Sequence, residues 1–342
     1  MENKAYNLNF LLDETSFAMY HVSMATKIQN QSTKNDPVLV DVPKACSDEL
    51  AAVEFLEKQR WGNSPACPVC GVFNVYKMMN SKTGERQANY RWRCNDCKSQ
   101  FTVRIGTVLE ESRIPFRHWC YAFWRASTSK KGVSALEIKR QTGLSYKSAL
   151  FLLNRIRFAM DEPVTPPLDG KVEIDETYVG GKVRYHGTKH HHASNDKTPV
   201  LAMVERGGRV RVKPIANVRG NTLKAVILES VAPTANIYTD EMRTYRSIGK
   251  NFASHQSVNH SAGEYVRGDV TSNTVESFFA TLKRGINGIY HAVSKEHLHR
   301  YTSEFQFRYN HRSLSDGART RAAIRSAEGK RLKYRECVRE AQ

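Results

Sequence analysis

The chain has 342 residues, of which 40% are hydrophobic and 25% are charged, as in ordinary folded proteins. Its 52 lysines and arginines outnumber the 34 aspartates and glutamates, so the formal net charge is +18 and the expected partner is a polyanion such as a nucleic acid. There is no run of about 18 apolar residues and the first residues make a poor signal peptide, so we expect a cytoplasmic protein without a membrane partner.

The N-terminal residues 1–45 are expected to form a tail without stable structure, because the stretch 29–35 is polar. A helix is expected at residues 47–60, with Ser47 as its N-cap and Gly62 just beyond its end. The folded part of the chain should therefore begin close to residue 46.

Two Cys-x-x-Cys pairs follow, and their members are Cys67, Cys70, Cys94 and Cys97. Two such turns can bring four thiolates onto one ion, for which zinc is the usual occupant. Three short strands are expected around them, at residues 75–77, 88–93 and 100–104. This is the plan of a zinc ribbon with a structural, non-catalytic Zn²⁺. An iron–sulfur ligand set or redox thiols are the alternatives, and neither requires the interleaved strands.

A helical segment comes next, with helices expected at residues 115–128, 133–141 and 146–160. The tight turn at 142–145 between the last two predicts a helix-turn-helix, whose second helix could enter a DNA major groove. We expect DNA contacts from side chains that face outward on that helix, namely Lys147, Arg155 and Arg157. The alternative is a plain helical hairpin with a solvated basic face.

Beyond a linker at 163–170, the pattern changes to alternating strands. Strands are expected at residues 171–179, 199–205, 209–215, 235–239 and 254–258, and a helix at 221–230. The loop 182–197 is rich in basic residues and histidine. It could bind a metal through His190, His191 and His192, but a basic loop that contacts phosphate through Lys182 and Arg184 is favoured.

Residues 271–290 carry two helical stripes. An apolar stripe predicts core packing, and a second stripe places Asn273, Glu276 and Lys283 on one face, followed by Arg284. Taken alone, the second stripe would be a solvated polar face. The order strand, strand, strand, helix, strand, helix is that of an α/β, RNase H-like fold, with a mixed sheet and flanking helices. In such a fold Asp175, Asp240 and Glu276 would meet at one point.

Three clustered carboxylates suit phosphodiester chemistry. Two Mg²⁺ (or Mn²⁺) ions about 4 Å apart can stabilise the attacking and leaving oxygens of an in-line displacement, and such hard ions prefer oxygen ligands. Lys283, on the face of Glu276, could reach a nearby phosphate. The flanking Glu173 and Glu176 are expected on the opposite face of the strand from Asp175.

The chain resembles bacterial insertion-sequence transposases of the ISXO-like group, which have an N-terminal zinc ribbon and an RNase H-like DDE domain. The matching stretches lie at residues 67–70, 172–181, 197–200, 238–241, 273–279, 282–285 and 307–312. The resemblance implies cleavage of double-stranded DNA at terminal inverted repeats, strand transfer to target DNA by the liberated 3′-hydroxyl, and a homo-oligomer during synapsis. It leaves either Asn273 or Glu276 as the third ligand, and the charge of Glu276 favours that residue.

Two other functions are compatible with this pattern. One is a domesticated regulator that binds DNA without catalysis, and the other is a nuclease of similar fold that hydrolyses DNA but never joins it. The expected organisation is a tail, a helix with the zinc ribbon, a helix-turn-helix region, a linker, the catalytic domain and a basic C-terminal extension, at residues 1–45, 46–110, 111–162, 163–170, 171–312 and 313–342.

Overall fold

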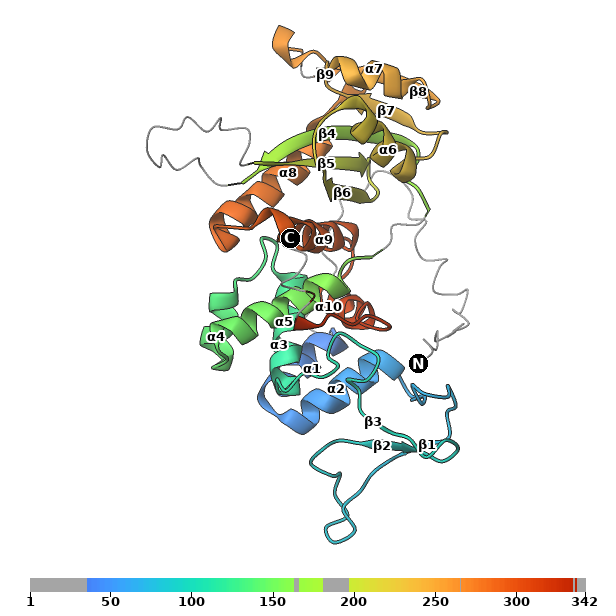
Figure 1. The fold of residues 1–342 in the computed structure, drawn as a ribbon, viewed down its shortest axis with the longest axis vertical. Helices are drawn as coiled ribbons and strands as arrows, with labels where there is room; N and C mark the ends of the chain where they lie inside the picture. Colours follow the sequence, from blue (N-terminus) through green and yellow to red (C-terminus); the bar gives the residue numbers. More distant parts are fainter. Residues whose placement is uncertain (1–35, 163–165, 181–196, 265, 335, 337–342) are drawn as a thin grey trace.

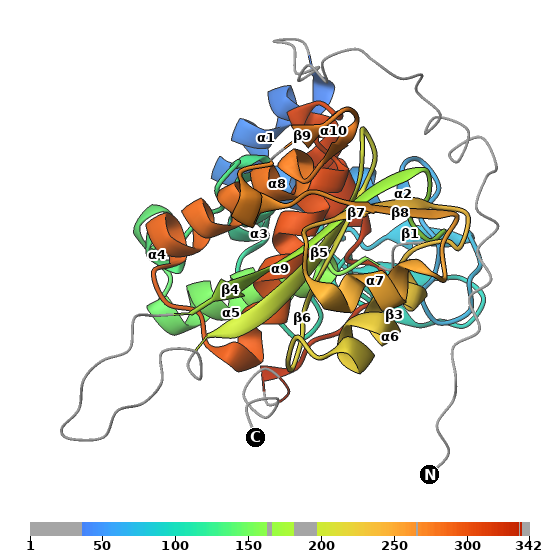
Figure 2. The same ribbon diagram turned by 90° about the horizontal axis from the view of Figure 1, so that it is seen from above.

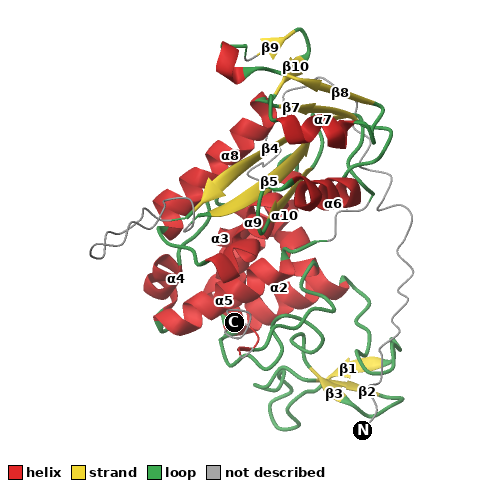
Figure 3. Ribbon diagram, turned by 45° about the horizontal axis from the view of Figure 1, so that its top comes forward, coloured by secondary structure: helices red, strands yellow, loops and turns green. Residues whose placement is uncertain are grey.

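The computed structural model describes residues 36–162, 166–180, 197–264, 266–334 and 336. Three parts follow one another along the long axis of the molecule (Figure 1). A small three-stranded sheet lies at one end, a group of helices in the middle, and a five-stranded sheet with its own helices at the other end (Figure 3). None of the described helices is both long enough and apolar enough to cross a membrane.

The three-stranded sheet has the order β1 (Val75–Lys77), β2 (Trp92–Cys94), β3 (Gln100–Phe101), and all its pairs are antiparallel. Strands were expected at all three places, although β2 and β3 are shorter than predicted. Trp61 contacts both Trp92 and Phe101 edge-on, with ring centroids 5.9 and 6.0 Å apart. This small sheet therefore uses a residue at the end of the preceding helix to complete its core.

The helical part begins earlier than the sequence pattern indicated. Helix α1 (Pro37–Ser47) buries Val38, Val42 and Ala45, so the expectation of an unstructured tail up to residue 45 is wrong for its last nine residues. Those three residues have the spacing of a helical face, i, i+4, i+7, but the polar run before them obscured it. Residues 1–35 lie outside the described part of the chain. The other helices here are α2 (Glu49–Trp61), α3 (Phe116–Thr128), α4 (Ala135–Thr142) and α5 (Tyr146–Ala159).

The C-terminal segment returns to this helical part. Helix α10 (Asp316–Arg325) buries Ala323 and Ile324 in the same core as α1 to α5. Asp36, at the N-terminus of α1, accepts a hydrogen bond from Ser315 at 2.7 Å. Residues 316–325 therefore complete the N-terminal core and do not form a separate extension. The frequent arginines of α10 hid its narrow apolar stripe.

The five-stranded sheet has the order β6-β5-β4-β7-β8. The first three strands in that order are antiparallel, while β4, β7 and β8 run parallel to one another, so the sheet is mixed as expected. Their bounds are β4 (Lys171–Val179), β5 (Thr198–Glu205), β6 (Val210–Pro214), β7 (Asn236–Thr239) and β8 (Ser254–Ser257). A two-stranded ribbon, β9 (Val266–Arg267) and β10 (Val270–Thr271), precedes helix α8.

Helices cover both faces of this sheet (Figure 2). Val172 and Ile174 of β4 pack with α6 (Gly220–Ser230) and α7 (Arg243–Gly249), whereas Val179 faces the core that includes α8 (Asn273–Gly285) and α9 (Leu298–Asn310). Successive side chains of a strand point to opposite faces, which explains the two separate cores. A π-helical turn, Ile286–Tyr290, continues α8.

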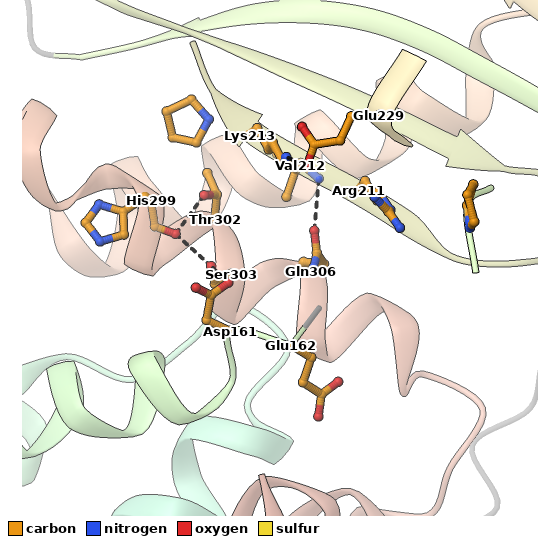
Figure 4. A pocket seen from close by; sticks show the side chains of 12 residues that line it. Asp161, Glu162, Arg211, Val212, Lys213, Glu229, His299, Thr302, Ser303 and Gln306 are labelled. Carbon is orange, nitrogen blue, oxygen red and sulfur yellow. Dashed lines mark hydrogen bonds and ion pairs between the residues drawn. The ribbon is translucent and has the colours of Figure 1, made fainter. Parts of the chain in front are cut away.

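Helix α9 seals the free edge of the sheet and joins the two large parts. Its Asn310 side chain accepts a hydrogen bond from the backbone N–H of Val210 on β6, at 2.8 Å. Its Gln306 side chain accepts one from the backbone N–H of Val212 on the same strand, at 3.0 Å (Figure 4). An edge strand without such partners would expose a template for pairing with other chains. Phe305 of α9 packs in the sheet core and Phe307 in the helical core.

Candidate active site

Two of the three predicted acids lie level with each other on neighbouring strands. In the parallel pairing of β4 with β7, Glu173 is opposite Tyr238. Asp175 and Asp240 each follow two residues later, so they occupy matching positions on strands that are about 4.8 Å apart. Asp240 stands just beyond the end of β7, where its Oδ1 accepts a hydrogen bond from the backbone N–H of Met242 at 3.0 Å.

The third acid comes from α8, which lies across the face of the sheet that carries Asp175. Val275, Phe279 and Leu282 of α8 are buried, as the apolar stripe predicted. Glu276 lies in the first turn of the helix and is exposed. The Ser272 hydroxyl donates to Glu276 Oε1 at 2.7 Å, so a local contact holds this carboxylate near the start of α8.

The neighbouring acids affect the electrostatics of Asp175. Burial, together with the negative charges of Glu176, Asp240 and Glu276, raises the pKa of Asp175 to about 7. A hydrogen bond that the Glu176 backbone N–H donates to Asp175 Oδ1, at 2.8 Å, opposes this shift only in part. Within the described residues, no lysine or arginine forms an ion pair with Asp175 or Asp240.

This donor set fits hard divalent cations. The candidate donors are carboxylate oxygens, which are the ligands that Mg²⁺ and Mn²⁺ prefer. Among the described residues these acids do not form a closed, metal-sized cluster as the four cysteines do, and a bound cation would relieve the repulsion that Asp175 experiences. The protein residues present are therefore suited to the metal ions that the sequence predicted.

The two glutamates that flank Asp175 differ from each other. Glu176 lies on the α7 side, where its carboxylate accepts a hydrogen bond from the Tyr245 hydroxyl, and burial raises its pKa. The expectation that Glu173 also faces away from Asp175 is wrong, because residues two apart on a strand share a face. Glu173 is fully buried and binds the N-terminus of α8. The period of two in the sequence could have revealed this.

Asn273, the other candidate for the third position, is exposed one turn before Glu276. Its backbone N–H donates to Thr271 Oγ1 at 3.1 Å. Ser272 occupies the N-cap position of α8, but its side chain makes no capping hydrogen bond. The choice of Glu276 over Asn273 as metal ligand remains a prediction.

Exposed basic residues lie farther along α8. Lys283 and Arg284 line a cavity of ≈ 450 Å³ together with Lys131, which precedes α4. A Cβ added at Gly285 would approach the Lys131 carbonyl oxygen to 2.7 Å, so the loop before α4 contacts this helix directly. The sequence pattern gave no signal for Lys131, because only the tertiary structure brings it to α8. Lys182, Arg184 and the three histidines of the loop 182–197 lie outside the described residues.

Two helices, α4 and α5, form around a short turn where a helix-turn-helix was predicted, and their assignment to that motif remains a prediction. Gly143 has φ 72°, a left-handed conformation that ends α4, and the Ser145 hydroxyl caps α5 by accepting from the Ser148 N–H at 3.1 Å. Lys147 is exposed at the start of α5. Contact of this pair of helices with DNA remains a prediction.

The expectation that Arg155 and Arg157 face outward is wrong. Both are buried. Arg155 donates to the carbonyl oxygens of Leu332 and Glu110 at 3.1 and 2.9 Å, and Arg157 pairs with Glu304 of α9 at 2.7 Å. Helix α5 is covered on this side by α9 and the C-terminal segment, so its second polar face is an interior face.

The four predicted zinc ligands come together. The sulfur atoms of Cys67, Cys70, Cys94 and Cys97 all lie within 4.8 Å of one another, and two of the sulfur pairs are 3.6 Å apart. A tetrahedral zinc site with bonds of about 2.3 Å requires sulfur separations of about 3.8 Å. The cluster is thus the size of a four-thiolate zinc site. Cys120, by contrast, is a buried thiol on α3, away from this cluster.

A larger cavity of ≈ 750 Å³ lies elsewhere, between the end of α5, strand β6 and helix α9 (Figure 4). Its lining mixes acids with bases, including Asp161, Glu162, Arg211, Lys213 and Glu229. None of the three acids of the candidate site lines it. The candidate active site, which lies at β4 and the end of β7, is therefore not in the larger of these two cavities.

Comparison with known proteins agrees with this geometry. Residues 167–310 match the family described as ISXO2-like transposase domain, and residues 47–100 match the transposase zinc-ribbon domain. An uncharacterized protein in transposable element ISH50 of Halobacterium salinarum is 30% identical over 286 residues, which span 78% of this chain and 92% of that protein. An uncharacterized transposase-like protein of Haemophilus influenzae is 29% identical over 100 residues, which are 29% of this chain and 80% of that protein.

These matches account for both ends of the molecule. The zinc-ribbon family and the four clustered cysteines support a structural Zn²⁺, and the DDE-type domain implies that the five-stranded sheet has an RNase H-like fold. The chain belongs to the ISXO2-like family of insertion-sequence transposases.

Proposed function

We propose that this protein cleaves the ends of its insertion element and joins them to target DNA by phosphodiester transesterification. The observation that supports the proposal is the placement of three carboxylates around the neighbouring strands β4 and β7. Asp175 comes from β4, Asp240 from the end of β7 and Glu276 from the first turn of α8, and Asp175 interacts electrostatically with both of the others.

Each of the three acids would help to hold metal ions at the reacting phosphate. Two Mg²⁺ or Mn²⁺ ions, when bound, would stabilise charge on the attacking and leaving oxygens. Asp175, whose pKa is raised by both other acids, would hold these ions together with Asp240 and Glu276. Asn273, one turn before Glu276, would orient the same region or supply an amide oxygen.

DNA would be held by basic groups outside the acidic edge. Lys283 and Arg284 are placed two turns beyond Glu276 on α8, about 10 Å along the helix axis. Lys147, at the start of α5, would contact the phosphate backbone where the helix-turn-helix meets a terminal inverted repeat. Synapsis of two element ends would require a homo-oligomer.

The test uses a duplex that carries one end of the element, taken from the DNA that flanks the gene, with a plasmid as target. With Mg²⁺ present, Asp175→Asn, Asp240→Asn and Glu276→Gln should each reduce cleavage and joining by more than about 100-fold, beyond the usual effect of residues that only orient a ligand. Glu229→Gln, on α6 and paired with Lys213, is the matched control and should retain activity.

The outcomes separate the alternatives. If all three variants keep wild-type strand transfer, the site assignment is wrong. If the wild-type protein binds the duplex but leaves it intact, a DNA-binding regulator is the better interpretation, and cleavage without joined products indicates a nuclease. Asn273→Ala compared with Glu276→Gln decides the third position, since only loss of a metal ligand should change the Mg²⁺ dependence strongly.

A further inference from the structure

Both carboxylate oxygens of Glu173, on strand β4, are hydrogen-bonded. Glu173 is fully buried, and its two carboxylate oxygens accept four hydrogen bonds. Oε1 accepts from Arg206 Nε at 2.6 Å and from the Thr274 hydroxyl at 2.9 Å, and Oε2 accepts from the backbone N–H groups of Thr274 and Val275 at 2.7 and 3.1 Å. Three of these donors belong to the start of α8.

These contacts replace the usual local cap of the helix. The first N–H groups of a helix have no partner within the helix, and they carry a partial positive charge. Ser272, at the capping position, makes no side-chain capping bond, and its hydroxyl donates to Glu276. A carboxylate from strand β4 therefore caps α8 across the interface between sheet and helix.

Arg206 fixes the same junction from the turn between β5 and β6. Besides Glu173, its guanidinium donates to the carbonyl oxygens of Asp269 and Thr271, at 2.7 and 3.1 Å. It also lies over the Tyr238 ring, 4.5 Å from the centroid. One cation thus binds the strand that carries Asp175, the strand that leads to Asp240 and the segment that leads to Glu276.

We propose that the Glu173–Arg206 pair is a positioning device that sets the distance between the first turn of α8 and strand β4, and thereby the placement of Glu276 against Asp175 and Asp240. This inference rests on the proposed function. Among the described residues, the hydrogen bonds to the Glu173 carboxylate come from Arg206 and the start of α8, and none comes from the three acids of the candidate site. Glu173 would act on the metal site only through the location of the helix.

The test compares Glu173→Gln with Asp269→Asn in the full-length, zinc-loaded protein. Glutamine keeps the shape of Glu173 but loses its charge and offers only one acceptor oxygen. Asp269→Asn is the matched control, because Asp269 also binds Arg206 through its carboxylate but is exposed and does not cap α8.

The first readout is amide hydrogen exchange in residues 272–279. Glu173→Gln should expose the Thr274 and Val275 amides to faster exchange, while Asp269→Asn should leave them protected. The second is the dissociation constant of Mn²⁺, measured by electron paramagnetic resonance without DNA. It should rise about 10- to 100-fold in Glu173→Gln, the range typical for groups that orient metal ligands, and stay unchanged in the control.

Wild-type Mn²⁺ affinity and wild-type exchange in Glu173→Gln would overturn the proposal. Should that variant fail to fold, Arg206→Lys serves with the same readouts, because lysine keeps the charge but not the forked geometry. It should raise the Mn²⁺ dissociation constant above the wild-type value, and unchanged affinity would again contradict the inference. If Asp175→Asn retains cleavage, the proposed function fails while the exchange result still decides whether Glu173 holds α8.

Discussion

Two acids, the buried Glu304 and the half-buried Asp175, meet opposite electrostatic environments in the same molecule. Glu304 on α9 receives hydrogen bonds from Arg157 and from the Tyr290 hydroxyl, both at 2.7 Å, and pairs with Arg308. Burial would raise its pKa, but the charges of Arg308 and Arg157 outweigh burial and hold it below the usual value. At Asp175 both burial and the neighbouring acids act in the same direction and raise the pKa.

The difference separates a structural acid from a functional one. The charge of Glu304 is balanced inside the protein, and the ion network it forms joins α5, α9 and the π-helical turn. The charge of Asp175 is balanced by no described basic side chain, which is typical of sites that receive a cation or do chemistry. The four-cysteine cluster is like Asp175 in this respect, because its thiolates also require an external cation.

The largest effect is expected at that cysteine cluster. Cys94→Ser should release zinc and unfold the ribbon, because structural zinc sites contribute binding free energies of about 10–16 kcal/mol to folding. Zinc content per chain, measured by mass spectrometry of the purified protein, should fall from one to near zero. Cys120→Ala, which removes a buried thiol outside the cluster, should retain the ion. Equal zinc content in both variants would contradict the ribbon assignment.

A large loss of stability is expected when Glu304 is neutralised. Glu304→Gln should lower the free energy of unfolding by about 3–5 kcal/mol, because it leaves two buried arginines without their carboxylate. Urea unfolding of the full chain measures this change. Asp41→Asn is the control, since Asp41 and its partner Lys58 are 43% and 65% exposed, and this change should cost about 0–1 kcal/mol. Asp175→Asn, without metal, should not destabilise, because it removes like-charge repulsion.

The difference in unfolding free energy between wild type and Glu304→Gln should depend on pH. Because the pKa of Glu304 is lowered in the folded state, its contribution is fully present above the unfolded value of about 4.5 and is lost as the pH falls through the folded pKa. The difference in unfolding free energy between wild type and Glu304→Gln should therefore be constant near neutral pH and shrink in acid. A difference that grows on acidification would contradict the assigned ion network.

The smallest effect is expected at the exposed cations near α8. Replacing Lys131 and Lys283 by glutamine should weaken binding to any duplex and reduce the slope of log affinity against log salt by about 0.9 for each lost phosphate contact. Fluorescence anisotropy over a range of salt concentrations measures this slope. Lys224→Gln, on α6 across the sheet, is the control and should leave the slope unchanged. If the Lys131 and Lys283 variant has the same slope as wild type, these two lysines do not contact DNA.

Much of the candidate site followed from sequence pattern, for identifiable reasons. Strand β4 was predicted with its observed bounds because its residues alternate, and the cysteine pairs have the spacing of a metal-binding turn. Asp175 lies within one predicted strand and Asp240 ends another, so placing them on neighbouring strands required only the parallel pairing of β4 with β7. Arg155 and Arg157 were misplaced because helical periodicity cannot show whether a second element covers the polar face.

The sequence by itself determined which residues form strands, helices and thiolate turns, since those depend on local periodicity and spacing. It also carried the family resemblance. Only the tertiary structure decided that α10 and α1 share a core, that Arg157 balances Glu304, and that Glu173 caps α8. The physical reason is that burial and charge balance are set by partners more than a hundred residues away, as for Glu173 and Thr274, and no local pattern encodes such a partner.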